Sequence, residues 1–190
     1  MDRFKVGMGM VTLMALAGLG LVACGSGGGG GGPRTVGPPP CCILPSHTFT
    51  VKGGGGQKFT VALPGNANYA PPALDSKHPG ITKQGWWVQK TEVLHSATAY
   101  VAPNAGAEEA LVKQGEAPPD PMTPAAPVSG HPAWIWQGTA VQAALSPSTA
   151  SMGYAEDLMV LDGNVVYSVW AASPSKGANA AFIRSFSVEG

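Results

Sequence analysis

Apolar and polar residues alternate with a period of two along much of the chain after residue 46. The alternation is clear in residues 48–51 and 59–63, and four glycines, residues 53–56, separate these stretches. A period of two is typical of strands that bury one face. The pattern therefore predicts two strands joined over the glycines as a loose hairpin.

Further strands are expected at three apolar stretches, residues 86–88, 97–101 and 133–141. The strongest hairpin signal follows later, where apolar residues 158–161 and 165–170 flank the pair Asp162-Gly163. An Asp-Gly pair between two apolar runs is typical of a tight turn between antiparallel strands. We therefore expect a hairpin here, and a short last strand at residues 187–188.

Two segments have helical patterns instead. Residues 107–115 place Glu109 and Lys113 at the i,i+4 spacing that stabilises helices, and residues 176–185 follow Ser173-Pro174-Ser175, which is suited to cap a helix. The prolines in residues 118–127 are expected to break regular structure. Many strands and two helices far apart in the sequence predict an α+β fold, in which helices cover an antiparallel β-sheet.

The first residues of the chain have the pattern of an export signal. Arg3 and Lys5 precede an uncharged stretch, residues 6–23, which ends in Leu21-Val22-Ala23-Cys24-Gly25. These residues resemble the lipobox of bacterial lipoproteins. The resemblance implies cleavage after Ala23, a diacylglyceryl thioether on Cys24, and a location on the outer side of a membrane in the bacterial cell envelope. An uncleaved transmembrane anchor is the alternative, although a span needs about 20 apolar residues.

Residues 24–45 are expected to form a flexible tether between the lipid and the rest of the chain, because glycine and proline dominate them and little apolar surface is available for burial. This segment also contains Cys41 and Cys42. Adjacent Cα atoms lie ~3.8 Å apart, closer than in most disulfides, so a bridge between these cysteines would be strained. A redox switch and intermolecular disulfides both stay open as interpretations.

Residues 46–190 are expected to form a single globular domain after the signal peptide, residues 1–23, and the tether. The domain has eight Lys or Arg residues against ten Asp or Glu residues, a formal net charge of about −2. The positive residues do not cluster, which argues against a nucleic-acid partner.

Three motifs in this domain resemble those of PsbP-like domains, the superfamily that includes the Mog-type Ran-binding proteins. They are Phe59-Thr60-Val61-Ala62-Leu63-Pro64-Gly65, then Val128-Ser129-Gly130-His131-Pro132-Ala133, and finally Val166-Tyr167-Ser168-Val169 with Ala181-Phe182-Ile183-Arg184-Ser185-Phe186. The resemblance implies an antiparallel sheet between helices, used for binding and assembly. The short predicted helix before Pro118 departs from the family pattern.

Residues with potential chemistry do not form a catalytic or metal-binding pattern in the sequence. Ser173 and Lys176 match S-x-x-K, but the S-D-N and K-T-G motifs that accompany it in penicillin-recognising enzymes are missing. The four histidines lack metal-ligand spacing, so no metal and no other cofactor is expected. We therefore predict that the chain is not an enzyme, and an envelope hydrolase is kept as a third hypothesis.

Five tryptophans are the strongest indication of a binding surface. Trp134 and Trp136 share one face of their predicted strand, whereas adjacent Trp86 and Trp87 must point to opposite faces. A partly exposed indole is suited to contact with a glycan, an apolar ligand or a protein. Trp87, Trp134 and Trp136 are the candidate binding residues, and burial of all five in the core is the simpler alternative.

These observations predict a lipid-anchored cell-envelope protein with a non-catalytic binding or assembly domain. Its partners would be the membrane, through the lipid, and another envelope protein. The alternative is a lipoprotein that binds a small apolar ligand or a carbohydrate on the tryptophan-lined surface.

Overall fold

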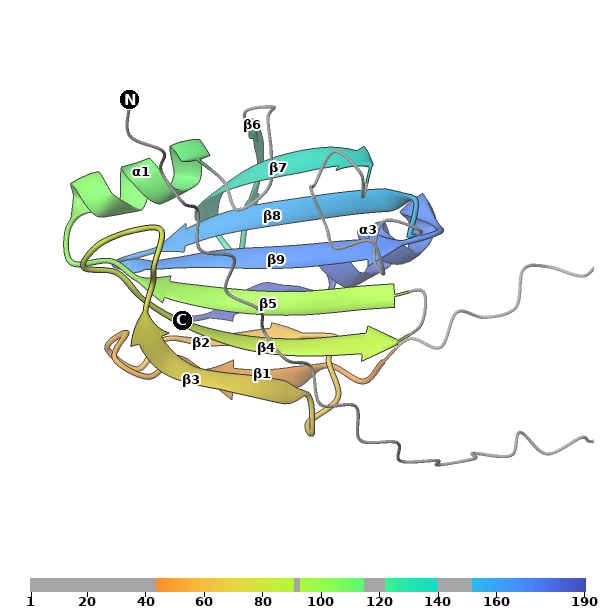
Figure 1. Ribbon diagram of the computed structural model, residues 1–190, viewed down its shortest axis with the longest axis horizontal. Helices are drawn as coiled ribbons and strands as arrows, with labels where there is room; N and C mark the ends of the chain where they lie inside the picture. Colours follow the sequence, from red (N-terminus) through yellow and green to blue (C-terminus); the bar gives the residue numbers. More distant parts are fainter. Residues whose placement is uncertain (1–43, 91–92, 115–121, 140–151) are drawn as a thin grey trace, which may run out of the picture. The chain divides into compact units, whose positions relative to one another are not determined.

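The structure, a computed structural model, describes residues 44–90, 93–114, 122–139 and 152–190, which all belong to one unit, Pro38–Gly190. Cys24, Cys41 and Cys42 lie outside the described residues. Within them the chain forms ten strands and two helices (Figure 1): β1 His47–Thr50, β2 Lys58–Val61, β3 Asn68–Leu74, β4 Thr82–Lys90, β5 Val93–Val101, α1 Ala105–Gln114, β6 Thr123–Val128, β7 His131–Thr139, β8 Tyr154–Asp162, β9 Val165–Ser173, α3 Lys176–Arg184 and β10 Ser187–Glu189.

Seven of these strands form an antiparallel sheet in the order β3-β4-β5-β9-β8-β7-β6 (Figure 1). Consecutive strands pair within β3-β4-β5 and within β6-β7-β8-β9, so the sheet consists of two meanders. The meanders join where β5 pairs with β9. The sheet therefore depends on β9 at its centre.

The predicted hairpin around Asp162-Gly163 is confirmed, with a shift of one residue in its loop. Asp162 is the last residue of β8 and pairs with Val165, so the two loop residues are Gly163 and Asn164. Gly163 has φ +58°, a positive value at the first loop position, as in type II′ turns. A glycine adopts this conformation without steric cost.

Every residue of β9 is buried, so this strand has core on both sides. Alternate side chains point to opposite faces of the sheet. Val165, Tyr167 and Val169 lie on the face that we call the inner face, and Ser168 and Trp170 lie on the outer face. A strand buried on both faces has a nearly continuous apolar sequence, which is what residues 165–172 show.

The inner face is covered by a second, three-stranded sheet, β1-β2-β10, together with α3. Phe59 of β2 lies at the centre of this interface, with its ring 5.1 Å from that of Trp86 and 5.4 Å from that of Tyr167, centroid to centroid. The predicted α+β fold, a sheet covered by helices, is therefore wrong, and the class is mainly β. The apolar residues that cover the inner face come from two segments distant in sequence, residues 47–63 and residues 182–188.

The outer face carries two smaller apolar clusters. One contains Ile81, Tyr100 and Val166 and packs under Leu111 and Val112 of α1. The other contains Trp136, Trp170 and Met152. Helices α1 and α3 lie at opposite ends of the sheet (Figure 1). In the described residues, no helix has the length and apolar character needed to cross a membrane.

Both edge strands of the large sheet contain prolines. Pro71 and Pro72 lie in β3, Pro124 and Pro127 lie in β6, and the pairing of each edge strand shifts register near its prolines. Proline lacks the N–H that a central strand needs but is tolerated at an edge. The predicted break at residues 118–127 is therefore wrong for residues 123–127, which form an edge strand.

Gln84 fastens the glycine loop between β1 and β2 to the inner face. The side chain of Gln84 is buried, accepts a hydrogen bond from Lys52 N at 3.1 Å, and donates one to Lys52 O at 2.9 Å. A Cβ at Gly54 would come within 2.8 Å of Val165 Cγ2, so the loop approaches the start of β9 closely. The predicted loose hairpin is confirmed as a hairpin, but Gln84 and the close approach of Gly54 to Val165 hold its loop in place.

We expect Gln84→Leu to lower the free energy of unfolding by roughly 1–3 kcal/mol, because the substitution leaves the Lys52 N–H and carbonyl without these partners. The melting midpoint should fall by several degrees. Gln89→Leu is the matched control, because Gln89 lies on the same strand and is exposed. Equal stability of the two variants would contradict the role given to Gln84.

Candidate functional site

The register of the strands places Trp87, Trp134 and Trp136 on the outer face. Trp136 lies opposite Asp157 of β8, and Asp157 lies opposite Trp170 of β9. Further along the same row, Ser96 of β5 lies between Trp170 and Trp87. The prediction that Trp134 and Trp136 share a face is confirmed, and so is the prediction that Trp86 and Trp87 point to opposite faces.

These three tryptophans do not form one open surface. Trp136 is only 4% exposed and belongs to the cluster with Trp170, whereas Trp134 is half-buried and packs with the residues under α1. Trp87 is half-buried on β4. On their shared face Trp136 is therefore buried, whereas Trp134 on the same strand and Trp87 on β4 are partly accessible.

The S-x-x-K motif does not bring its serine and lysine together. Ser173 is buried, and its hydroxyl donates to the carbonyl of Ser175 at 2.8 Å. Ser175 caps α3 and accepts from Ala178 N at 3.4 Å. Lys176 Nζ instead lies 5.1 Å from the centroid of the Tyr154 ring. Both serines thus have structural roles, as the capping interpretation of this segment predicts.

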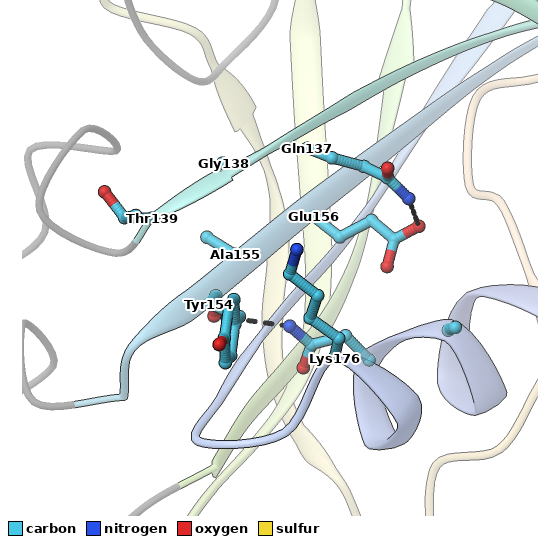
Figure 2. Close-up of a pocket in the computed structure, with 9 residues that line it drawn as sticks. Gln137, Gly138, Thr139, Tyr154, Ala155, Glu156 and Lys176 are labelled. Atoms are coloured by element: carbon cyan, nitrogen blue, oxygen red, sulfur yellow. Dashed lines mark hydrogen bonds between the residues drawn. The ribbon is translucent and has the colours of Figure 1, made fainter.

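The structure contains a pocket of about 410 Å³ between the ends of β7 and β8 and the first turns of α3 (Figure 2). Its position follows from the β8–β9 hairpin. The register pairs Tyr154 with Ser173, and α3 begins three residues after Ser173, so its first turn lies beside Tyr154. Period two along β8 then places Glu156 on the same face as Tyr154, and period 3.6 along α3 places Asn179 near Lys176.

The pocket contains hydrogen-bond acceptors that are buried and incompletely paired. Glu156 is 6% exposed, and its carboxylate accepts one hydrogen bond in the described residues, from Gln137 Nε2 at 2.7 Å (Figure 2). Asn179 is 1% exposed and donates from Nδ2 to Tyr154 O at 3.2 Å, while its Oδ1 is buried and has no hydrogen-bond partner in the described residues. A carboxylate and an amide oxygen both accept hydrogen bonds, so this part of the pocket favours a donor.

An aromatic ring and a positive charge border these acceptors. Tyr154 is 37% exposed, and the ammonium of Lys176 lies over its ring. The side chains of Lys176, Tyr154 and Glu156 surround one region of the pocket (Figure 2). The arrangement is able to bind a small polar group through charge, hydrogen bonds and a π-face.

Sequence reasoning missed this pocket. The sequence motifs included Lys176 only as part of S-x-x-K and did not include Glu156. The signal was present in the spacing, because Tyr154 and Glu156 share a strand face, and Lys176, Asn179 and Ala180 share a helix face. Glu156 and Asp157 point to opposite faces of the sheet, since Asp157 lies on the outer face and accepts from Ser168 Oγ at 2.9 Å.

A second polar cluster lies in the connection between β3 and β4. Asp75 is buried, hydrogen-bonds His78 Nδ1, and forms an ion pair with Lys83 Nζ at 2.9 Å. Burial by itself would raise the pKa of Asp75. Hydrogen bonds from Lys83 and His78, the charge of Lys83 and a backbone hydrogen bond from Lys77 outweigh burial and hold this pKa below its ordinary value. The cluster fastens the connection, since Asp75 N also donates to Ile81 O at 2.8 Å.

No protein-family model, no curated protein and no solved structure matches the chain. The resemblance to PsbP-like domains therefore stays a prediction. In the described residues, no three His, Cys, Asp or Glu side chains lie close enough to hold a metal ion together.

We expect Asp75→Asn to lower the free energy of unfolding by about 1–2 kcal/mol near neutral pH. A carboxyl group with a lowered folded-state pKa stabilises the fold above its unfolded pKa, about 3.9, and loses that contribution as pH falls through the folded pKa. The difference between wild type and variant should therefore shrink in acid, as urea unfolding at several pH values would measure.

Asp162→Asn is the comparison for this experiment, because Asp162 lies 3.6 Å from His131 Nδ1 in a more exposed contact. A difference between Asp75→Asn and wild type that stays constant down to acid pH would contradict the lowered pKa.

Proposed function

We propose that this chain is a lipid-anchored protein of the bacterial cell envelope, and that its β-domain is a non-catalytic binding module. Cys24 would carry the lipid, and residues 24–45 would separate the domain from the membrane. The ligand would occupy the pocket between β7, β8 and α3. Another envelope component is the expected partner, and this pocket is the part of the domain most suited to recognise it.

One observation supports the pocket most directly, namely the two incompletely paired acceptors, Asn179 Oδ1 and the Glu156 carboxylate. A buried polar group without a partner costs roughly 1–3 kcal/mol in protein mutational data. Most buried polar groups in native proteins have partners, so each exception needs an explanation, and a bound ligand would supply one here. A ligand that donates hydrogen bonds would recover this free energy on binding.

The arrangement of the nucleophilic side chains supports a binding role over catalysis. Ser173 donates to a backbone carbonyl and Ser175 accepts from a helix N–H, and no hydrogen bond in the described residues joins either hydroxyl to Lys176. A general base must lie within hydrogen-bond reach of the group that it activates. The hydrolase hypothesis therefore has no support from the S-x-x-K motif.

A second candidate is the tryptophan-lined surface, as a site for an apolar ligand or a carbohydrate. Trp87 favours it, because this half-buried indole lies beside Ser96, and the neighbouring positions Gly85 and Thr98 are also small and only partly buried. Small side chains next to an indole leave room for a ring to stack. Trp87 and Trp134 are the partly accessible tryptophans of this surface, since Trp136 is buried.

The anchor is tested by Cys24→Ala. We expect the variant to remain uncleaved or to appear in the soluble fraction, because the thioether cannot form. Fractionation and mass spectrometry of the mature N-terminus measure this. Detergent extraction and processing identical to wild type would contradict lipidation at Cys24.

The pocket is tested by filling it. Ala180 lines the pocket, so Ala180→Phe should abolish the thermal stabilisation given by any ligand that binds there. A ligand present at a hundred times its dissociation constant adds ~2.7 kcal/mol to the free energy of unfolding. The melting midpoint of a domain of this size then rises by several degrees. The full chain in detergent would be screened against small amines, saccharides, carboxylic acids and lipid headgroups.

Ala181→Phe is the matched control for the screen, because Ala181 lies on the same helix and is exposed. A hit that stabilises Ala180→Phe as strongly as Ala181→Phe binds elsewhere, and the pocket would then not be the binding site.

A further inference from the structure

We propose that the pocket between β7, β8 and α3 binds a primary alkylammonium group, and that Lys176 occupies the same site as an internal competitor. This inference rests on the proposed binding function and adds the chemical class of the ligand. Three features of the pocket carry it: the Glu156 carboxylate, Asn179 Oδ1 and the ring of Tyr154.

The orientation of the Asn179 amide is determined by its neighbour. The carbonyl oxygen of Tyr154 only accepts hydrogen bonds, so the amide nitrogen of Asn179 must face it, at 3.2 Å. Reversing the amide would place two acceptors against each other. Asn179 Oδ1 therefore points away from this carbonyl, is buried, and accepts from none of the described residues.

The Glu156 carboxylate also has few hydrogen-bond partners among the described residues. It is 6% exposed and accepts a single hydrogen bond, from the neutral amide of Gln137, in the described residues. A carboxylate has about four acceptor positions. Buried charges are usually paired with an opposite charge, and within the described part of the chain no ion pair neutralises Glu156. The most favourable complement for this group is a cation with N–H donors.

The Tyr154 ring already has a primary ammonium above it. Lys176 Nζ lies 5.1 Å from the ring centroid, within the range of cation–π contacts. Lys176 is exposed, so its side chain is able to leave the ring when another cation arrives. An incoming ammonium would gain the ring, the carboxylate and the amide oxygen together, whereas among the described residues Lys176 contacts the ring alone.

The effect of Lys176 on binding differs between an alkylammonium ligand and a neutral or zwitterionic ligand. For a saccharide or an amino acid, Lys176 would supply hydrogen bonds or a counter-charge, and removing it would weaken binding. For an alkylammonium group, Lys176 opposes binding through its charge and its position. The sign of the effect of Lys176→Ala therefore distinguishes the ligand classes.

The experiment is an NMR titration of the full chain in detergent, with n-butylammonium as the probe and the Asn179 side-chain amide as the reporter. We expect a saturable shift of this amide. Glu156→Gln should weaken binding about tenfold or more, because it removes a charge-assisted hydrogen bond but keeps the shape. Lys176→Ala should strengthen binding about two- to fivefold, and Tyr154→Ala should weaken it about threefold.

Tyr69 and Lys52 provide matched controls. Lys52 Nζ lies 5.7 Å from the centroid of the Tyr69 ring, and Tyr69 is 38% exposed, so this pair repeats the Tyr154–Lys176 contact outside the pocket. Tyr69→Ala and Lys52→Ala should leave the affinity unchanged. n-Butanol, which has the same chain length without the charge, should leave the Asn179 signal unshifted.

Three results would overturn the proposal: an Asn179 amide that does not respond to n-butylammonium, equal responses to n-butanol and n-butylammonium, or weaker binding after Lys176→Ala. A second probe, Nα-acetyl-lysine amide, identifies the source of the ammonium group. Tighter binding than n-butylammonium indicates a lysine side chain of a partner protein, and weaker binding indicates a free small amine; both results support the proposal. If another compound class stabilises the wild type but not Ala180→Phe, the binding function stands and the ammonium assignment fails.

Discussion

The pairing of β8 with β9 is the constraint on which the rest of the structure depends. β9 is buried on both faces and joins the two meanders of the large sheet, so its register decides which side chains face the small sheet and which face outward. A slip of one residue would exchange Tyr167 with Ser168 and place a hydroxyl in the inner core. The two-residue loop at Gly163 fixes this register. Gly54 and Gln84 hold the loop between β1 and β2 against the start of β9, so the small sheet depends on the same strand.

The same pairing creates the pocket. It brings the start of β8 to the end of β9, where the chain turns directly into α3. The inner-face residues Gln137 and Thr139 at the end of β7 are exposed, which shows that the three-stranded sheet does not cover this corner. Polar side chains gather where the apolar cover ends, and Glu156 and Asn179 are buried there without a complete set of partners. The proposed binding function therefore depends on two features: the β8–β9 pairing, which positions the pocket, and the incompletely paired acceptors that line it.

Most strands of the domain were predictable from the sequence, but which segments cover the inner face of the large sheet was not. Alternation revealed the strands at residues 48–51 and 59–63, apolar stretches revealed those at Trp86 and Trp136, and Asp162-Gly163 revealed the central hairpin, because these signals are local. The three strands of the small sheet were predicted, but the pairing of β10 with β2 was not, since β10 has three residues and pairs with a strand more than a hundred residues earlier. The prolines of β3 and β6 concealed two edge strands, because proline is read as a break unless the position at an edge is known. Predicting the pocket would have required both the hairpin register and the first residue of α3. The face shared by Trp134 and Trp136 was predicted correctly, but Trp136 is buried and was a candidate binding residue.

The most direct test of ammonium binding in the pocket is a high-resolution crystal structure of the full chain with n-butylammonium in the crystallisation solution. We expect density for the amine between the Glu156 carboxylate and Asn179 Oδ1, within hydrogen-bond distance of both, and a Lys176 side chain that has left the Tyr154 ring. A pocket in which Asn179 Oδ1 accepts from the protein itself, with Lys176 still on the ring and no amine bound, would contradict ammonium binding there.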